Sequence, residues 1–93
     1  MTTLENISHI LAADFNPSTK ISLIALIMEG RPMTVADLNA TLNLNKTLQN
    51  YQDIFESFID AGFIKMTSFK TPAGIKRFHF EISDITAFIE TLD

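Results

Sequence analysis

The stretch LNKTLQNYQDIFESFIDAGFIK, residues 44–65, combines a helical repeat of apolar residues with an abrupt stop. Its apolar side chains recur at spacings of three and four residues, which is typical of one helix face turned towards a core. These inward positions are Leu48, Tyr51, Phe55 and Phe58. Asn45 or Thr47 suits the N-cap of this helix, and Gly62 suits its left-handed C-cap. The stretch therefore predicts a helix over residues 45–61 that another kind of structure follows at once.

The residues after this helix alternate with a period of two, which is typical of β-strands. In the second strand, the apolar Phe78, Phe80 and Ile82 share one face, and the polar residues between them share the other. The sequence TPAG, residues 71–74, places Pro and Gly where tight turns favour them. A β-hairpin is therefore predicted over residues 63–82.

A central helix is predicted before these elements. Asn16 is placed as an N-cap, and Pro17 occupies the first helical position, where its missing N–H costs nothing. The helix that follows is apolar on nearly every side up to about Glu29, which is the pattern of a helix packed on several neighbours. Gly30 and Pro32 prevent it from continuing.

Thr34 then caps a short helix with apolar residues on one side. The turn after this helix contains Leu44, which is available to fill the joint between two helices. Two helices joined by a turn are therefore predicted over about residues 34–62.

The two ends of the chain also carry helical signals. Thr2 and Glu5 have the spacing of a capping box, and a helix is predicted over residues 3–15. Ser83 is placed to cap a last helix over residues 83–92.

The resulting order, α-α-(β)-α-α-β-β-α, resembles the winged helix-turn-helix superfamily, most closely its MarR- and ArsR-type regulators. The short strand and the first helix of the motif correspond to MEGRPMTVADLNATLNLNKT. The recognition helix corresponds to YQDIFESFIDAGFIK, which ends in AGFIK as in many such regulators. The wing corresponds to KTPAGIKRFHFEIS. The resemblance covers roughly residues 17–82, with a slightly longer segment between Leu44 and Ala61 than the common pattern. It implies a mostly α fold with a small β-hairpin (α+β). The length of 93 residues predicts one domain over residues 1–93.

Charge is distributed unevenly along the chain. The net charge of −4 argues against polyanion binding by the whole surface. From Lys65 to His79 there are four basic residues and no acid, whereas from Glu81 onwards there are four acids and no base. Any surface that binds a polyanion is therefore expected to be local and to lie in the hairpin.

The resemblance implies that the outward face at the start of the recognition helix meets base edges in the major groove of DNA. The positions there outside the core stripe are Lys46, Thr47, Gln49, Asn50, Gln52 and Asp53. Gln and Asn suit adenine, and Asp can accept from cytosine, although amides at a helix start are equally ordinary surface residues. Asp53, Glu56 and Asp60 lie progressively towards the C-terminal half, where DNA need not approach.

The wing supplies the positive charge that the recognition helix lacks. Lys70, Lys76, Arg77 and His79 are predicted on or near the hairpin tip, where side chains can meet phosphates. Lysines on a strand edge also prevent aggregation, but four basic side chains without an acidic one are more than that purpose needs. We therefore interpret these residues as a DNA-binding group.

Both terminal helices carry an apolar stripe. The predicted interface residues are Leu4, Ile7, Leu11, Ile85, Phe88, Ile89 and Leu92. The stripes either cover the core of one chain or pair across a two-fold axis, and we favour the homodimer. A dimer would place two recognition helices roughly 34 Å apart, one turn of DNA.

Other classes of function lack their signals. The chain has no Cys, which fits a cytoplasmic protein, and its two histidines have no further ligands at metal-binding spacing. The sequence shows neither a nucleophile–base pair nor a Gly-rich phosphate loop, so we do not expect an enzyme. We expect no cofactor. No signal peptide or membrane span is expected, since the longest apolar run is too short.

Two functions are compatible with these features. The first is a small, homodimeric regulator that binds specific double-stranded DNA sequences. The second is a winged-helix module, such as an adaptor or a viral or plasmid-borne modulator, that binds a protein instead. The acidic balance and the acid-bearing helix favour the second, because such a helix suits a basic partner.

Overall fold

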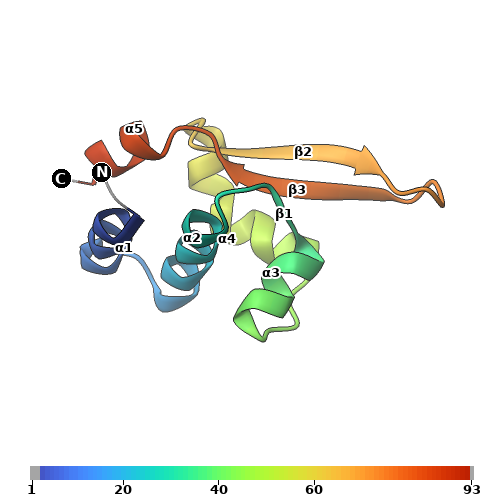
Figure 1. The fold of residues 1–93 in the computed structure, drawn as a ribbon, viewed down its shortest axis with the longest axis horizontal. Coiled ribbons are helices and arrows are strands. Elements are labelled where there is room, and N and C mark those ends of the chain that lie inside the picture. Colours follow the sequence, from blue (N-terminus) through green and yellow to red (C-terminus); the bar gives the residue numbers. More distant parts are fainter. Residues whose placement is uncertain (1–2, 93) are drawn as a thin grey trace.

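The computed structural model describes residues 3–92, which form a compact α+β domain with a three-stranded antiparallel sheet (Figure 1). The helices are α1 (Thr3–Ala12), α2 (Pro17–Glu29), α3 (Val35–Leu42), α4 (Leu48–Asp60) and α5 (Ile85–Glu90). The strands are β1 (Met33–Thr34), β2 (Ile64–Lys70) and β3 (Lys76–Ile82). The predicted fold class, mostly helical with a β-hairpin, is confirmed. None of the helices in residues 3–92 is long and apolar enough to cross a membrane.

The sheet has the strand order β1-β3-β2, so β3 is central. The hairpin of β2 and β3 pairs from Ile64 opposite Ile82 to Lys70 opposite Lys76. The very short β1 pairs only with His79 and Phe80, in the middle of β3. The far end of the hairpin extends beyond the helices, which gives the molecule its long dimension of 43 Å against 24 and 22 Å (Figure 1).

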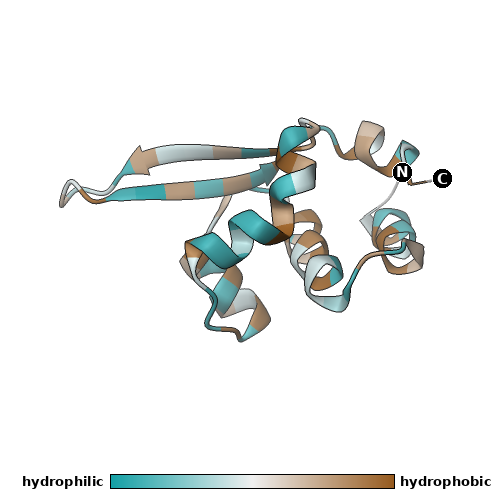
Figure 2. Cartoon of the chain, turned by 180° about the vertical axis from the view of Figure 1, so that it is seen from behind, coloured by the Kyte–Doolittle hydropathy of each residue, from teal (hydrophilic) through white to brown (hydrophobic). Residues whose placement is uncertain are grey.

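The core is built around aromatic side chains of α4 and the sheet. Tyr51 and Phe55 of α4 are fully buried, and the ring of Phe55 lies 5.2 Å from that of Phe80 on β3. Phe58, one turn later, contacts Phe88 of α5 at 5.3 Å between ring centroids. Hydrophilic and hydrophobic residues alternate along α4 and along the two long strands, β2 and β3 (Figure 2). Each buried aromatic ring contributes about 2–3 kcal/mol of hydrophobic stabilisation, so this stripe holds helices and sheet together.

The predicted starts and stops around α2 and α4 follow local chemistry. The Asn16 side chain accepts a hydrogen bond from Thr19 N at 2.8 Å, and Pro17 begins α2. Gly30 has a φ of 63°, a left-handed conformation that glycine adopts without strain. Gly62, with a φ of 83°, turns the chain from α4 towards β2 as predicted.

Some predicted boundaries at the two ends were wrong. Asp84, not Ser83, caps α5, because the Ser83 hydroxyl donates instead to the carbonyl of Gly62 at 2.8 Å. The first helix ends at Ala12, before Phe15, whose ring packs edge-on against a core phenylalanine. Thr2 of the predicted capping box lies outside the described residues.

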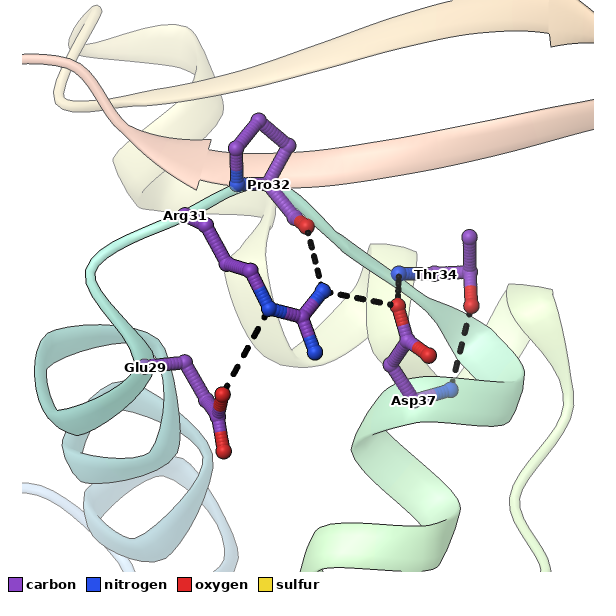
Figure 3. Close-up of polar contacts among 5 residues, drawn as sticks. All are labelled: Glu29, Arg31, Pro32, Thr34 and Asp37. Carbon is purple, nitrogen blue, oxygen red and sulfur yellow. Dashed lines mark hydrogen bonds and ion pairs between the residues drawn. The ribbon is translucent and has the colours of Figure 1, made fainter.

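Arg31 links the end of α2 to the first turn of α3 (Figure 3). Its guanidinium pairs with Glu29 at 3.5 Å and with Asp37 at 3.3 Å, and it also donates to the carbonyl of Pro32. Asp37 in turn accepts from Thr34 N at 3.1 Å, while the Thr34 hydroxyl accepts from Asp37 N. The hydrogen bond from Thr34 N, together with Arg31, lowers the pKa of Asp37 against the opposing effect of desolvation.

Acid is expected to destabilise the protein through Asp37. A carboxyl with a lowered folded-state pKa stabilises the fold fully above its ordinary value of 3.8, and this contribution is lost as pH falls through the folded-state pKa. Between about pH 5 and about pH 2, the unfolding temperature should therefore fall by more in the wild type than in Asp37→Asn. Asn keeps a side-chain oxygen for Thr34 N. Equal losses in both proteins would show that Asp37 is not the source.

Candidate nucleic-acid interface

Asn39 of α3 fixes the position of α4 through three hydrogen bonds. Its side-chain oxygen accepts from Lys46 N at 3.0 Å and from the Tyr51 hydroxyl at 2.7 Å, and its Nδ2 donates to the Lys46 carbonyl at 2.9 Å. Asn43 makes the turn between the helices with a left-handed φ of 53°. The start of α4 is therefore held to α3 by one carboxamide, which we call the Asn39 clasp.

The Asn39 clasp was missed in the sequence. Asn is unfavourable in the interior of a helix. Its presence next to the inward Leu38 in a short helix was therefore the available signal that its side chain makes a specific hydrogen bond. Its partner Tyr51 is fully buried, and burial raises the pKa of its hydroxyl. A buried hydroxyl needs a hydrogen-bond partner, which Asn39 provides.

Two of the predicted base-reading residues form the cap of α4. The Thr47 hydroxyl accepts from Asn50 N at 3.2 Å, and the Asn50 side-chain oxygen accepts from Thr47 N at 2.9 Å. This reciprocal capping box selects Thr47 over Asn45 as the N-cap. It commits the Asn50 oxygen to the backbone and leaves its Nδ2 for a ligand.

The two predicted glutamines are also engaged with other side chains. Gln49 donates to Asp53 at 2.9 Å one turn later, and Gln52 donates to the sulfur of Met66 on β2 at 3.6 Å. Asp53 therefore lies beside Gln49 in the first half of α4, nearer to the helix start than the sequence pattern suggested. The exposed Glu56 continues the same outward face.

Exposed cations surround the hairpin tip. Lys70 and Lys76 are directly opposite each other, and Arg77 is the next residue along β3. The turn between the strands is closed by Thr71, whose N–H donates to the Ile75 carbonyl at 2.9 Å. Residues 64–80 contain no acid, and within residues 3–92 none of these cations forms an ion pair.

His79 lies away from the tip, contrary to the prediction that it would be near it. It is half-buried in the central strand, between Thr34 of β1 and Thr67 of β2. Its ring stacks on that of Phe69 at 4.1 Å, with 14° between the planes. The His79 ring is therefore packed against Phe69 within the sheet, and the exposed cations nearer the tip are the residues that a ligand can reach.

The structure brings the hairpin together with the starts of α3 and α4. A cavity of about 560 Å³ lies between them. It is lined by Thr34, Val35, Ala36, Asn39, Leu48, Phe69, Thr71, Lys76, Arg77 and Phe78. By contrast, Lys46 and Asn50 line a separate hollow against the start of α2, together with Asn16 and Asp53. Lys76 and Arg77 therefore border a different hollow from Lys46 and Asn50, and Gln49 and Gln52 border a third one on the outward side of α4.

The terminal helices use their apolar residues unequally. Phe88 and Ile89 of α5 are buried within one chain, with exposed fractions of 2% and 0%, so they are unavailable to a partner. Leu4 and Leu11 of α1 have exposed fractions of 74% and 57%. Of the predicted dimer interface, α1 therefore offers the accessible apolar residues, while Ile7, Ile85 and Leu92 are half-buried.

No protein-family model matches the chain, and no curated protein matches it.

Removing the Asn39 clasp should destabilise the protein more than removing one of its partners. Asn39→Ala leaves the Lys46 backbone and the Tyr51 hydroxyl without their partner and should cost on the order of 2–3 kcal/mol. Tyr51→Phe removes one hydrogen bond and should cost about 1 kcal/mol. Denaturant unfolding measures both, with the exposed Asn45→Ala as the control in the same turn. A loss in Asn39→Ala no larger than in Asn45→Ala would contradict the role of the clasp.

The capping role of Asn50 can be separated from any role in binding. Asn50→Ala should lower the free energy of unfolding by about 1 kcal/mol, because the Thr47 N–H loses its acceptor. Asn50→Asp keeps that acceptor and places a negative charge in the first helical turn, so it should retain wild-type stability. Thermal unfolding of both variants tests this, and equal destabilisation would show that the side-chain oxygen does not cap α4.

Proposed function

We propose that this protein is a small winged helix-turn-helix regulator that binds double-stranded DNA. The observation that carries the proposal is the hairpin tip, where Lys70 faces Lys76 across the ladder with Arg77 beside them. Like charges directly opposite each other destabilise a sheet. An anion at the tip relieves this repulsion, and the phosphates of DNA are such anions.

The order and pairing of the elements support this proposal. The chain runs from α2 through the short strand β1 to α3 and α4, and then into the hairpin of β2 and β3. The short strand β1 pairs with β3, the second strand of the hairpin. In the proposed complex, α4 enters the major groove by its first turn and the hairpin serves as the wing on adjacent phosphates. Lys46, just before α4, is the cation at that helix start.

A homodimer would complete the DNA-binding unit. The exposed Leu4 and Leu11 make α1 the element best suited to a two-fold contact. Two copies related in this way would read half-sites about one helical turn, roughly 34 Å, apart.

A protein-binding module is the second candidate, and one observation favours it. The outward side of α4 borders a hollow of about 300 Å³ that Asp53, Glu56 and Asp60 line together with Met66. Because Gln49 is hydrogen-bonded to Asp53, the helix presents carboxylates close to the residues proposed to read bases. Such a surface suits a basic protein and repels DNA.

Reversing one charge at the tip should weaken DNA binding without regard to sequence. A fluorescently labelled duplex of mixed sequence is titrated with protein at several salt concentrations, and anisotropy gives the Kd. Lys76→Glu should raise the Kd more than tenfold at low salt and reduce the log–log salt slope by about one unit, as expected for one lost phosphate contact.

Lys20→Glu is the control because it makes the same change in net charge on α2, outside the hairpin. Its unfolding temperature is measured alongside, because the Lys20 ammonium also donates to the Leu11 carbonyl at 2.8 Å. Its effect on the Kd should be much smaller. Equal losses in the two variants would mean that only total charge matters. A wild-type protein that does not bind at the lowest salt, or that binds with no dependence on salt, would contradict the proposed function.

A further inference from the structure

Within residues 3–92, β2 pairs with β3 alone, so one of its edges has no strand beside it. At the tip end of this ladder, the Thr71 N–H donates to the Ile75 carbonyl at 2.9 Å. At the other end, the Ser83 N–H donates to the Phe63 carbonyl, also at 2.9 Å. Because antiparallel partners alternate between bonded and non-bonded pairs, the odd-numbered residues of β2 turn their backbone groups to β3. The even-numbered residues turn theirs to the open edge, and they are Ile64, Met66, Ser68 and Lys70.

The open edge of β2 is long and regular. Its seven residues pair with β3 in an unbroken register without a bulge, and none of them is a proline. Natural edge strands avoid pairing with other chains through bulges, prolines or charged side chains. In β2 the charged residues are Lys65 and Lys70. Another strand can therefore pair along this edge if it places suitable groups beside the two lysines.

Opposite charges lie at the two ends of this edge. The side chains of Ile64, Met66 and Lys70 share one face of the sheet. This face is turned towards α4, because Ile64 is buried and Met66 accepts a hydrogen bond from Gln52. Lys70 is exposed at the tip end of the face. At the other end, beside Met66, lies the hollow of about 300 Å³ with the exposed carboxylates of Asp53, Glu56 and Asp60.

We propose that a second copy of this protein binds at the open edge, with the two β2 strands antiparallel about a two-fold axis. Antiparallel pairing brings the tip end of each strand to the α4 end of the other. When the axis passes Thr67, the two strands pair along their whole length, and the two Thr67 side chains form a favourable cross-strand pair. Lys70 of one copy is then opposite Ile64 of the other, on the face where Glu56 and Asp60 lie. Each tip lysine thus meets the carboxylates of the other copy.

The charges favour a second copy over other strands. A purely acidic strand would be repelled by the carboxylates beside Met66, and a purely basic one by Lys70. A second copy presents a cation and carboxylates in the order that the edge requires. Moving the axis to Lys65 or to Lys70 would place two like charges directly opposite each other, which destabilises a sheet. The same lysines therefore suit this partner and exclude those registers.

This contact is separate from the homodimer through α1 and goes beyond the proposed function. It covers Lys70 and the outward side of α4, which the proposed DNA complex brings close to DNA. Self-association at β2 therefore competes with DNA binding, whereas a contact through α1 leaves the hairpin free. Because the contact forms without DNA, its test needs none and stands apart from the test of DNA binding.

Sedimentation equilibrium at low salt measures this self-association. The parent protein carries Leu11→Glu, which places a charge on the exposed apolar side of α1 and prevents a dimer through that helix. It should form dimers that dissociate as salt is added, because the charges that meet are close to solvent. Lys70→Glu in this parent should raise the dimer Kd about tenfold, because attraction becomes repulsion at both contacts. The α4 variant, Glu56→Lys with Asp60→Lys, should raise it by a similar factor.

Mixing these two variants tests the pairing of the charges. In a mixed dimer, the reversed tip of one copy meets the reversed α4 of the other, and the unchanged tip meets the unchanged α4. Attraction is thus restored at both contacts. A fluorescently labelled Lys70→Glu protein should therefore dimerise with the α4 variant as tightly as the parent does with itself.

Ser68 tests the backbone ladder between the copies. Its N–H faces the open edge, so Ser68→Pro removes a hydrogen bond between copies and none to β3. Dimers should be lost in Ser68→Pro and kept in Ser68→Ala, which retains the N–H. The unfolding temperatures of both variants show whether the hairpin is intact.

Three results would overturn the proposal. The first is a parent protein that stays monomeric at low salt. The second is a mixture that dimerises no more tightly than either variant alone, which would mean that the tip and α4 do not meet. The third is equal dimerisation of Ser68→Pro and Ser68→Ala.

Discussion

The three hydrogen bonds of Asn39 join α3 to the turn before α4 and to α4 itself. One carboxamide serves both backbone groups of Lys46 and the hydroxyl of Tyr51. Tyr51 is buried beside Phe55 and Phe80, so the same bonds connect the turn before α4 to the aromatic core. Because α4 leads through Gly62 into β2, the direction of the hairpin follows from the direction of α4. The clasp therefore holds the start of α4 against α3 and anchors it to the aromatic core on which the hairpin also packs.

This arrangement separates charge of opposite sign onto two neighbouring elements. The carboxylates of Asp53, Glu56 and Asp60 lie along α4, whereas the exposed Lys76 and Arg77 lie on the hairpin. The negative net charge of the chain is thus compatible with a local attraction for a polyanion. In the proposed complex, attraction comes from the hairpin, and α4 approaches DNA by its capped first turn. The acidic remainder of α4 limits how deeply the helix can enter a groove.

Features that depend on neighbouring residues were predictable from the sequence, and those that depend on distant ones were not. The caps at Asn16, Thr34 and Thr47 and the left-handed Gly62 follow from local backbone chemistry, so the helices and the hairpin were predicted in their correct order. The Asn39 clasp and the displacement of the α5 cap from Ser83 depend on contacts between elements. Among the predicted site residues, the exposed lysines were located correctly by hairpin register, whereas the stacking of His79 on Phe69 depends on a diagonal contact across the ladder.

The most direct test of the DNA-binding proposal is selection of bound duplexes from a pool of random sequence. The pool is mixed with the protein at low salt, retained duplexes are amplified over several rounds, and the enriched sequences are determined. The proposal predicts one enriched motif with two related half-sites about a helical turn apart, read by the first turn of α4 in each copy of a homodimer. Retained duplexes with no motif above the input pool, or no retention at all, would contradict it.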